Sequence, residues 1–431
     1  MRYEPINPEL FVFNRNKLAN KLLTKSISIL NSNDVMPTNA DGTMGFKQNS
    51  DLFYLSGIDQ EETILLLYPD APEEKFKEIL FIRETSDLIA TWEGYKLTKD
   101  QARTISGIKT VFWISDFDTI FSQLMFEAQN VYLNTNEHAR NSSRVQSRDD
   151  RFIIETLQKF PLHTYHRLAP ILQNHRSIKH QIEVELISKA CKITEKGFRR
   201  LLNFVKPGVW EYEIEAEFLH EILINRSRGT AYSSIVASGA NANILHYVEN
   251  NAQCKDGDLI LLDIGAEYAN YHSDMSRTIP VNGKFNARQA AIYNAVLSVM
   301  KQATQLLVVG NTLTEYHATV GKIMEEELIK LGLLNADDVK KQNPAAPLYK
   351  KYFMHGTSHY LGLDTHDVGS RFAKFEAGMV FTCEPGIYIK EEGIGIRLEN
   401  NFVINQTGKP TDLMSTIPLE LSDIEDLMKS K

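Results

Sequence analysis

Cysteine and long apolar runs are both scarce in this 431-residue chain. Its three cysteines lie far apart and form no C-x-x-C pair, which is too few for a disulfide framework and argues against the usual structural zinc site. No apolar run approaches the roughly 18 residues that span a membrane, and prolines and acidic residues interrupt the opening MRYEPINPEL, where a signal peptide has an unbroken apolar stretch. We therefore expect a reduced, cytoplasmic protein without an export signal or a membrane span.

Positive charge is also in short supply. Lysine and arginine number 47 against 55 for aspartate and glutamate, which gives a formal net charge of −8. Such a protein repels phosphate backbones, so we expect no nucleic-acid partner. The sequence also lacks a G-x-S-x-G elbow, a GxxxxGK[ST] loop and a G-x-G-x-x-G turn after a strand. These absences argue against serine hydrolases, P-loop nucleotide hydrolases and dinucleotide-binding enzymes.

The length and the change of pattern along the chain predict two domains, 1–176 and 177–431. The first alternates short apolar runs with amphipathic stretches, which is typical of an α/β domain. Its strands are expected at 26–30, 51–57, 62–68, 78–84, 110–115 and 130–134, with a loop over 136–150.

The second domain opens with a long amphipathic helix and continues as an α+β domain. Helices are expected at 178–205, 211–226, 286–309 and 313–331. Strands are expected at 233–239, 258–268, 276–281, 381–389 and 395–404.

Two aspartates lie eleven residues apart in LLDIGAEYANYHSDMSRT. Asp263 ends a buried apolar strand, and the polar tract after it would let the chain turn back so that Asp274 lies beside Asp263 on a paired strand. Without a cation, two such carboxylates would repel each other strongly. The alternative, in which one aspartate caps a turn and the other is solvated, remains open at this point.

Two glutamates repeat this pattern. FTCEPGIYI and GIRLENNFVI are apolar strands with Glu384 and Glu399 in their middles, and the turn-like KEEGIG between them predicts a hairpin that brings the glutamates together. Arg397 is on the same face as Glu399 by strand alternation. An Arg–Glu ion pair that stabilises the sheet is therefore an open alternative.

Histidines cluster in FMHGTSHYLGLDTHDVG, which holds His355, His359 and His366 of the twelve in the chain. His355 and His359 have the i, i+4 spacing of a helical zinc protease motif, but the residues between them are poor helix formers and include no glutamate base. Another candidate, His246, follows a Gly/Asn loop that could hold it at the edge of a cleft, or simply hydrogen-bond it in place. Taken together, the four carboxylates and one histidine favour two divalent cations, Mn²⁺ before Zn²⁺, with a hydrolytic water activated between them.

Five segments of this sequence resemble one known family. LLDIG, SDMSRT, MHGTSHYLGLDTHDVG, EPGIY and GIRLEN resemble the pita-bread metallopeptidases, most closely aminopeptidase P (Xaa-Pro aminopeptidase). The stretch DLFYLSGIDQEETILLLYPD is similar to the creatinase-like N-terminal domain of that family. The resemblance covers nearly the whole chain and implies an α/β N-terminal domain followed by an α+β pita-bread (creatinase/aminopeptidase) catalytic domain.

The resemblance also implies roles for individual residues. The implied metal ligands are Asp263, Asp274, His359, Glu384 and Glu399. The implied contacts with substrate or transition state are His246, His355 and His366, and Arg397 matches an arginine next to the bridging glutamate. Glu384 would in addition pass a proton toward the leaving proline nitrogen.

The activity implied is release of an N-terminal residue from peptides whose second residue is proline, by a homodimer or homotetramer. Prolidase, which cleaves Xaa-Pro dipeptides with similar ligands, is the alternative within this class. A non-hydrolytic pita-bread protein is the alternative outside it, and the five filled ligand positions disfavour that interpretation.

Overall fold

The computed structural model describes residues 2–429, which form two compact units. One runs from Pro5 to Arg176, and the other from Ser177 onward together with the first residues up to Glu4. We refer to them as the N-terminal unit and the catalytic unit. In the described residues, no helix combines the length and the apolar character that a membrane crossing requires.

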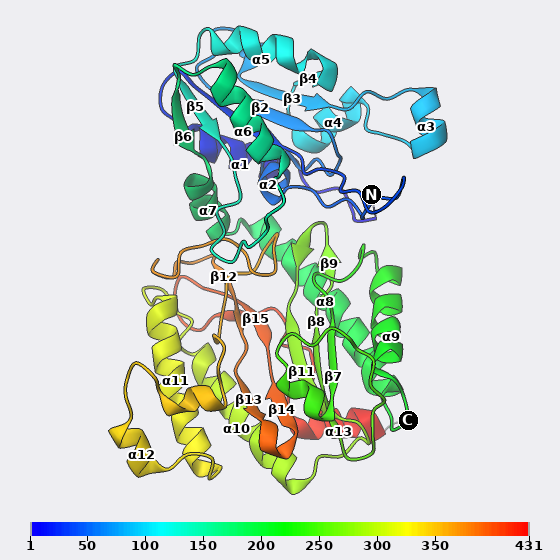
Figure 1. Ribbon diagram of the computed structural model, residues 1–431, viewed down its shortest axis with the longest axis vertical. Helices are drawn as coiled ribbons and strands as arrows, with labels where there is room; N and C mark the ends of the chain where they lie inside the picture. The colour runs from blue at the N-terminus through cyan, green and yellow to red at the C-terminus, as the bar shows by residue number, and fades with distance from the viewer. Residues whose placement is uncertain (1, 430–431) are drawn as a thin grey trace. The chain divides into compact units, whose positions relative to one another are not determined.

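The N-terminal unit is built on a six-stranded mixed sheet in the order β4-β3-β2-β1-β5-β6 (Figure 1). The strands are β1 Ser26–Asn31, β2 Ile64–Leu67, β3 Glu78–Ile82, β4 Thr110–Trp113, β5 Asn130–Leu133 and β6 Thr164–Arg167. β2 is antiparallel to both of its neighbours, whereas β4, β5 and β6 each join by parallel pairing. Five of these strands confirm the apolar runs in the sequence; β6 was not predicted because its residues, TYHR, are polar and none is buried.

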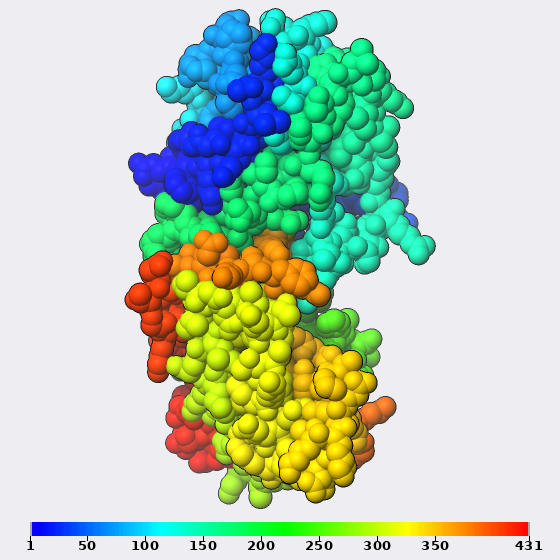
Figure 2. Space-filling view, turned by 90° about the vertical axis from the view of Figure 1, so that its left-hand side faces the viewer, coloured from blue at the N-terminus to red at the C-terminus, as the bar shows by residue number. Residues whose placement is uncertain are grey.

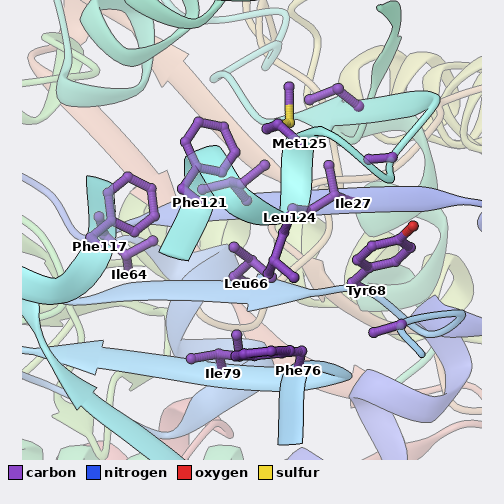
Figure 3. Close-up of a cluster of buried hydrophobic side chains, with 14 of the residues drawn as sticks. Ile27, Ile64, Leu66, Tyr68, Phe76, Ile79, Phe117, Phe121, Leu124 and Met125 are labelled. Carbon is purple, nitrogen blue, oxygen red and sulfur yellow. The ribbon is translucent and has the colours of Figure 1, made fainter. Parts of the chain in front are cut away.

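Seven helices of the described chain accompany this sheet. They are α1 Glu9–Ala19, α2 Ser50–Ser56, α3 Asp87–Glu93, α4 Lys99–Ser106, α5 Phe117–Met125, α6 Arg148–Lys159 and α7 Ala169–Ser177. Figure 3 shows side chains of α5 meeting those of β1, β2 and β3 in an apolar core, where the rings of Phe117 and Phe121 stack with centroids 5.2 Å apart. This core positions the sheet by burying one of its faces.

The strand expected at 51–57 is wrong, because this segment is helix α2. The side chain of Asn49 caps the helix by accepting the backbone N–H groups of Asp51 and Leu52, and Gly57 ends it with a left-handed φ of 68°. Five consecutive buried residues, LFYLS, made the run read as a strand. The two caps outweigh that apolar pattern, because each satisfies backbone groups that a helix end leaves unpaired.

In the catalytic unit, a pair of long helices packs against strands (Figure 1). These helices are α8 Gln181–Phe204 and α9 Glu211–Ile224, and they confirm the first two helices expected from the sequence. They approach closely at Gly197, where an added Cβ would lie 2.5 Å from the ring of Phe218. The strands beside them form a three-stranded antiparallel sheet in the order β11-β8-β7. Its strands are β7 Ile235–Ser238, β8 Leu259–Ile264 and β11 Met275–Pro280, and the short β9 Glu267–Tyr268 and β10 Tyr271–His272 lie between the last two.

The remaining helices of this unit are α10 Ala287–Thr304, α11 Leu313–Lys330, α12 Ala336–Lys341 and α13 Leu421–Lys429. α10 and α11 confirm the predicted pair, though α10 ends five residues before the expected 309. In the face seen in Figure 2, α11 and the segment after it, in yellow, form the middle of the surface of the catalytic unit, with orange and red segments beside them.

The two glutamate-bearing segments each form two strands instead of one. They are β12 Val380–Cys383, β13 Gly386–Ile389, β14 Ile394–Arg397 and β15 Asn400–Val403. The short β16 Thr411–Asp412 pairs antiparallel with β15. β12 pairs with β15 and β13 with β14, so the predicted hairpin is confirmed but is interrupted halfway along. Glu384 and Glu399 stand in the two opposed interruptions, where their side chains are not bound to the alternation of a regular strand.

Candidate metal centre

Asp263 and Asp274 lie together at one end of the β8–β11 pair. Asp263 is opposite Ser276 in the antiparallel register, and Asp274 directly precedes β11. The hydroxyl of Tyr232 lies 2.6 Å from Oδ1 of each aspartate. A phenol carries a single proton, so it can donate to only one of these oxygens at a time, and the other oxygen needs a proton of its own or a cation.

The interrupted hairpin brings Glu384 and Glu399 to the same place. The backbone N–H of Glu399 donates to the carbonyl of Ser276 (3.0 Å), and the Ser276 hydroxyl donates to Oε2 of Glu399 (2.9 Å). Oε1 of Glu399 is buried and has no hydrogen-bond partner. A buried carboxylate oxygen without a donor is costly, so this atom calls for a cation.

His359 completes the cluster from a segment that runs antiparallel to β12. Its backbone N–H and carbonyl bond to the hydroxyl and backbone N–H of Thr382. Its Nδ1 lies 2.9 Å from the carbonyl of Tyr360, an acceptor that fixes the proton on Nδ1. Nε2 is therefore left with a lone pair, and it lies 3.4 Å from Oδ2 of Asp274 and 3.5 Å from Oε1 of Glu384. This is the tautomer that a metal-binding histidine needs.

These side chains include a group with the spacing of a metal site. Asp274, His359 and Glu399 each offer one ligand atom, and these atoms all lie within 4.8 Å of one another. Asp263 and Glu384 border the group through the contacts described above. The five donors are four carboxylates and one imidazole, which suits a divalent cation.

The pKa values of the four carboxyl groups also indicate a cation site. Burial raises the pKa of Glu384 to about 7, although the charge of His359 opposes it. Burial and then the charge of Asp274 raise the pKa of Glu399 well above its usual range. Burial also raises the pKa of Asp263, although Arg397 opposes this. Burial acts in the same direction on Asp274, but the hydrogen bond and charge of a His359 that carries a second proton, on Nε2, outweigh it and lower the pKa of Asp274; a cation bound to Nε2 would take the place of that proton. Four carboxylates confined in this way cannot all ionise without added positive charge.

Arg397 does not pair with Glu399, contrary to the ion pair left open by strand alternation. β14 ends at Arg397, and the Ser276 hydroxyl lies between the two side chains: it accepts from Nε of Arg397 (2.8 Å) and donates to Oε2 of Glu399 (2.9 Å). The guanidinium of Arg397 instead donates to Oδ2 of Asp263 (2.5 Å) and, through its other nitrogens, to the hydroxyls of Ser276 and Tyr388. Arg397 therefore fixes Asp263 and completes a chain of hydrogen bonds behind the acidic cluster.

The other three predicted histidines, His355, His366 and His246, lie outside the ligand group, each in a different environment. Nε2 of His355 lies 2.8 Å from the Tyr388 hydroxyl and its Nδ1 lies 2.8 Å from the carbonyl of Gly356, so protein atoms engage both nitrogens. The ring of His366 stands edge-on to that of His359, with centroids 4.3 Å apart, and His366 is exposed. His246 is exposed on the loop after the short 3₁₀ helix η3 Gly239–Asn243, near enough to His355 to contribute to lowering its pKa.

Sequence reasoning missed Tyr232, Ser276 and Tyr388, which orient the acidic residues. Ser276 sits two residues after Asp274 in a strand, so alternation could have placed it on the same face. Tyr232 and Tyr388 carry no such signal, because a tyrosine next to an apolar run is an ordinary core residue.

Comparisons with known proteins give a consistent result. The model of metallopeptidase family M24 matches residues 185–406, and that of the aminopeptidase P N-terminal domain matches residues 11–132. The chain is 35% identical to a Xaa-Pro aminopeptidase of Haemophilus influenzae over 97% of each protein. A solved Bacillus anthracis structure assigned to aminopeptidase P superposes with a TM-score of 0.92 at 33% identity, covering 99% of both chains. Zinc-substituted Escherichia coli aminopeptidase P, in complex with product, gives 0.88 at 32% identity, with the same coverage.

Proposed function

Because the chain belongs to metallopeptidase family M24 and carries an aminopeptidase P N-terminal domain, we propose that it is a metal-dependent Xaa-Pro aminopeptidase. It releases the N-terminal residue of peptides that have proline in second position. The observation that carries this proposal is the buried acidic cluster, in which Glu399 has an oxygen without a donor and His359 presents a bare Nε2.

The proposed ligands are Asp263, Asp274, His359, Glu384 and Glu399. We propose that they hold two divalent ions and that the ions are Mn²⁺, since oxygen ligands outnumber nitrogen and no thiolate is among them. When bound, such ions neutralise the carboxylates and lower the pKa of water to near neutrality.

The residues around the cluster then divide the chemical work. Glu384 takes a proton from the attacking water and delivers it to the nitrogen of the leaving proline. His246 and His366, both exposed at the edge of the cluster, donate hydrogen bonds to the scissile carbonyl as negative charge develops on its oxygen. His355 acts through Tyr388 and Arg397, because its own nitrogens are already engaged.

Selectivity for proline follows from what proline lacks. Its amide has no N–H, so a site for it cannot use that hydrogen bond and must recognise the shape of the ring. Substrates with an ordinary residue in second position would bring an extra N–H that has no acceptor.

We further propose that the enzyme is a cytoplasmic homo-oligomer, a dimer or tetramer. Its three cysteines, Cys191, Cys254 and Cys383, are all free and buried, as is usual in a reducing compartment. Helix α3 buries none of its residues, and Leu88 and Trp92 in it are 69% and 81% exposed, which favours contact with another subunit. Light scattering after gel filtration measures the mass directly.

The decisive experiment compares two substrates after manganese loading, an Xaa-Pro-Xaa tripeptide and an Xaa-Pro dipeptide, each with a chelator control. We expect chelator-sensitive cleavage of the tripeptide at a clearly higher kcat/KM than of the dipeptide. The reverse preference would make the protein a prolidase. Absence of both activities, with metal bound, would refute the proposal and favour a non-hydrolytic pita-bread protein.

A further inference from the structure

A buried ion pair lies close behind the histidine-bearing segment of the catalytic unit. Nζ of Lys179 is 2.8 Å from Oδ2 of Asp367, and each side chain is only 1% exposed. Lys179 stands just before helix α8, and its backbone N–H donates to the carbonyl of Gly378 (2.9 Å). Removing both charges from water costs desolvation free energy, so a buried ion pair at this position indicates a role beyond stability.

The space for the pair comes from a glycine. A Cβ added at Gly362 would lie 2.2 Å from Oδ2 of Asp367 and 2.9 Å from Cε of Lys179. The neighbouring acid, Glu183, accepts the backbone N–H of His180 and the hydroxyl of Tyr271, and it lies close enough to the pair for the charges of Lys179 and Asp367 to act on it. The local packing therefore presents Lys179 with Asp367 in a position that no larger residue at 362 would permit.

The pair fixes the loop that carries His366. Asp367 follows His366 directly, and its backbone N–H donates to the carbonyl of Tyr360 (2.9 Å), which closes residues 360–367 into a loop. His272 holds the same loop from the other side. Its backbone N–H donates to the carbonyl of Gly362, and its Nδ1 lies 2.8 Å from the hydroxyl of Thr365. His366 is thereby held with its ring 4.3 Å from that of His359.

We propose that Lys179 and Asp367 are positioning residues for catalysis: their buried ion pair locks the loop 360–367 so that His366 faces the substrate carbonyl. The inference rests on the role assigned to His366 in the proposed function. The ion pair does not touch the substrate, and its effect passes through the backbone that joins Asp367 to His366. A displacement of about 1 Å at a group that stabilises a transition state is enough to slow turnover roughly a hundredfold.

A double-mutant cycle tests this with four manganese-loaded enzymes: wild type, Lys179→Met, His366→Ala and the double variant. If the pair acts through His366, we expect Lys179→Met to lower kcat by about 10- to 100-fold in the wild-type background and by less than about twofold in the His366→Ala background. Metal content should stay unchanged in all four enzymes, since the pair contacts none of the proposed ligands.

Two further variants protect the test against a simple folding defect. Asp367→Asn keeps the volume and an acceptor for Lys179, and Gly362→Ala displaces Asp367 without removing either charge; the same cycle is run with each. Lys189→Met is the matched control, because this lysine lies on α8 with 47% of its side chain exposed, and its contacts are an ion pair with Glu4 and a cation–π contact with Tyr268 (5.5 Å), both outside the pair and its loop. We expect the control to leave kcat and KM unchanged.

The outcomes separate this inference from the proposed function. Equal loss of kcat in both backgrounds, or no loss in the wild-type background, would overturn the inference alone. Full kcat in His366→Ala itself would overturn the role of His366 and with it the inference.

Discussion

Asp149 offers a sharp test of how burial controls the stability of the N-terminal unit. It lies in the first turn of α6 and is 8% exposed. Its Oδ1 accepts a hydrogen bond from Nδ2 of Asn31, at the end of β1, at 2.8 Å. Burial, followed by the charge of Asp51, raises the pKa of Asp149 from 3.8 to about 7. An ionised Asp149 therefore opposes the contact between α6 and β1.

The raised pKa of Asp149 determines how stability changes with pH. The folded state binds the proton of Asp149 more tightly than the unfolded state does. The contribution of Asp149 to stability is therefore largest below pH 3.8, falls as the pH rises toward 7, and levels off above it. Each pKa unit corresponds to about 1.36 kcal/mol. Between pH 5 and pH 8 the folded carboxyl loses its proton while the unfolded one is already ionised, which removes about 3 kcal/mol.

Asp149→Asn keeps the volume and an oxygen that accepts from Asn31, but it removes the charge. We expect its stability advantage over the wild type to grow by about 3 kcal/mol from pH 5 to pH 8. Hydrogen exchange of peptides covering Asn31 and residue 149 measures the local opening free energy without requiring two-state unfolding of both units. Asp118→Asn, an exposed acid in the first turn of α5, is the control. An advantage that does not change with pH would refute the reasoning.

Three other changes test the catalytic unit. Asp274→Ala should abolish turnover and lose metal, because Asp263 and Glu399 are left to repel each other; full metal occupancy with substantial activity would contradict the ligand assignment. Tyr232→Phe removes the hydroxyl shared by two aspartates, and we expect metal affinity, measured by competition with a chelating dye, to weaken about 10-fold or more; unchanged affinity would show that the ions alone orient them. Gly197→Ala should lower the free energy of unfolding by about 1–3 kcal/mol, because the new methyl group meets the ring of Phe218; an unchanged thermal midpoint would mean that the two helices separate freely.

Much of the fold follows directly from local pattern. The apolar runs at 62–68 and 78–84 became β2 and β3, and the three- and four-residue spacing over 178–205 became α8. In these segments the residues that favour the element locally are also the ones buried against the rest of the chain, so propensity and tertiary packing agree.

Where local and long-range forces differ, prediction failed. Residues 51–57 have the apolar content of a strand, but the caps at Asn49 and Gly57 make them a helix. The Arg397–Glu399 ion pair that strand alternation left open is not formed: β14 ends at Arg397, and its guanidinium pairs with Asp263.

The sequence by itself determined which chemical groups are available: four carboxylates and a histidine cluster placed beside apolar strands, in a chain with few cysteines. It also determined most helices and strands, since these depend on neighbours within a few residues. Only the tertiary structure decided that the glutamates stand in two opposed strand breaks, that Tyr232 joins the aspartates, and that Lys179 reaches Asp367. Such contacts join residues up to 188 positions apart, and no local pattern encodes them, because they depend on how separate elements pack.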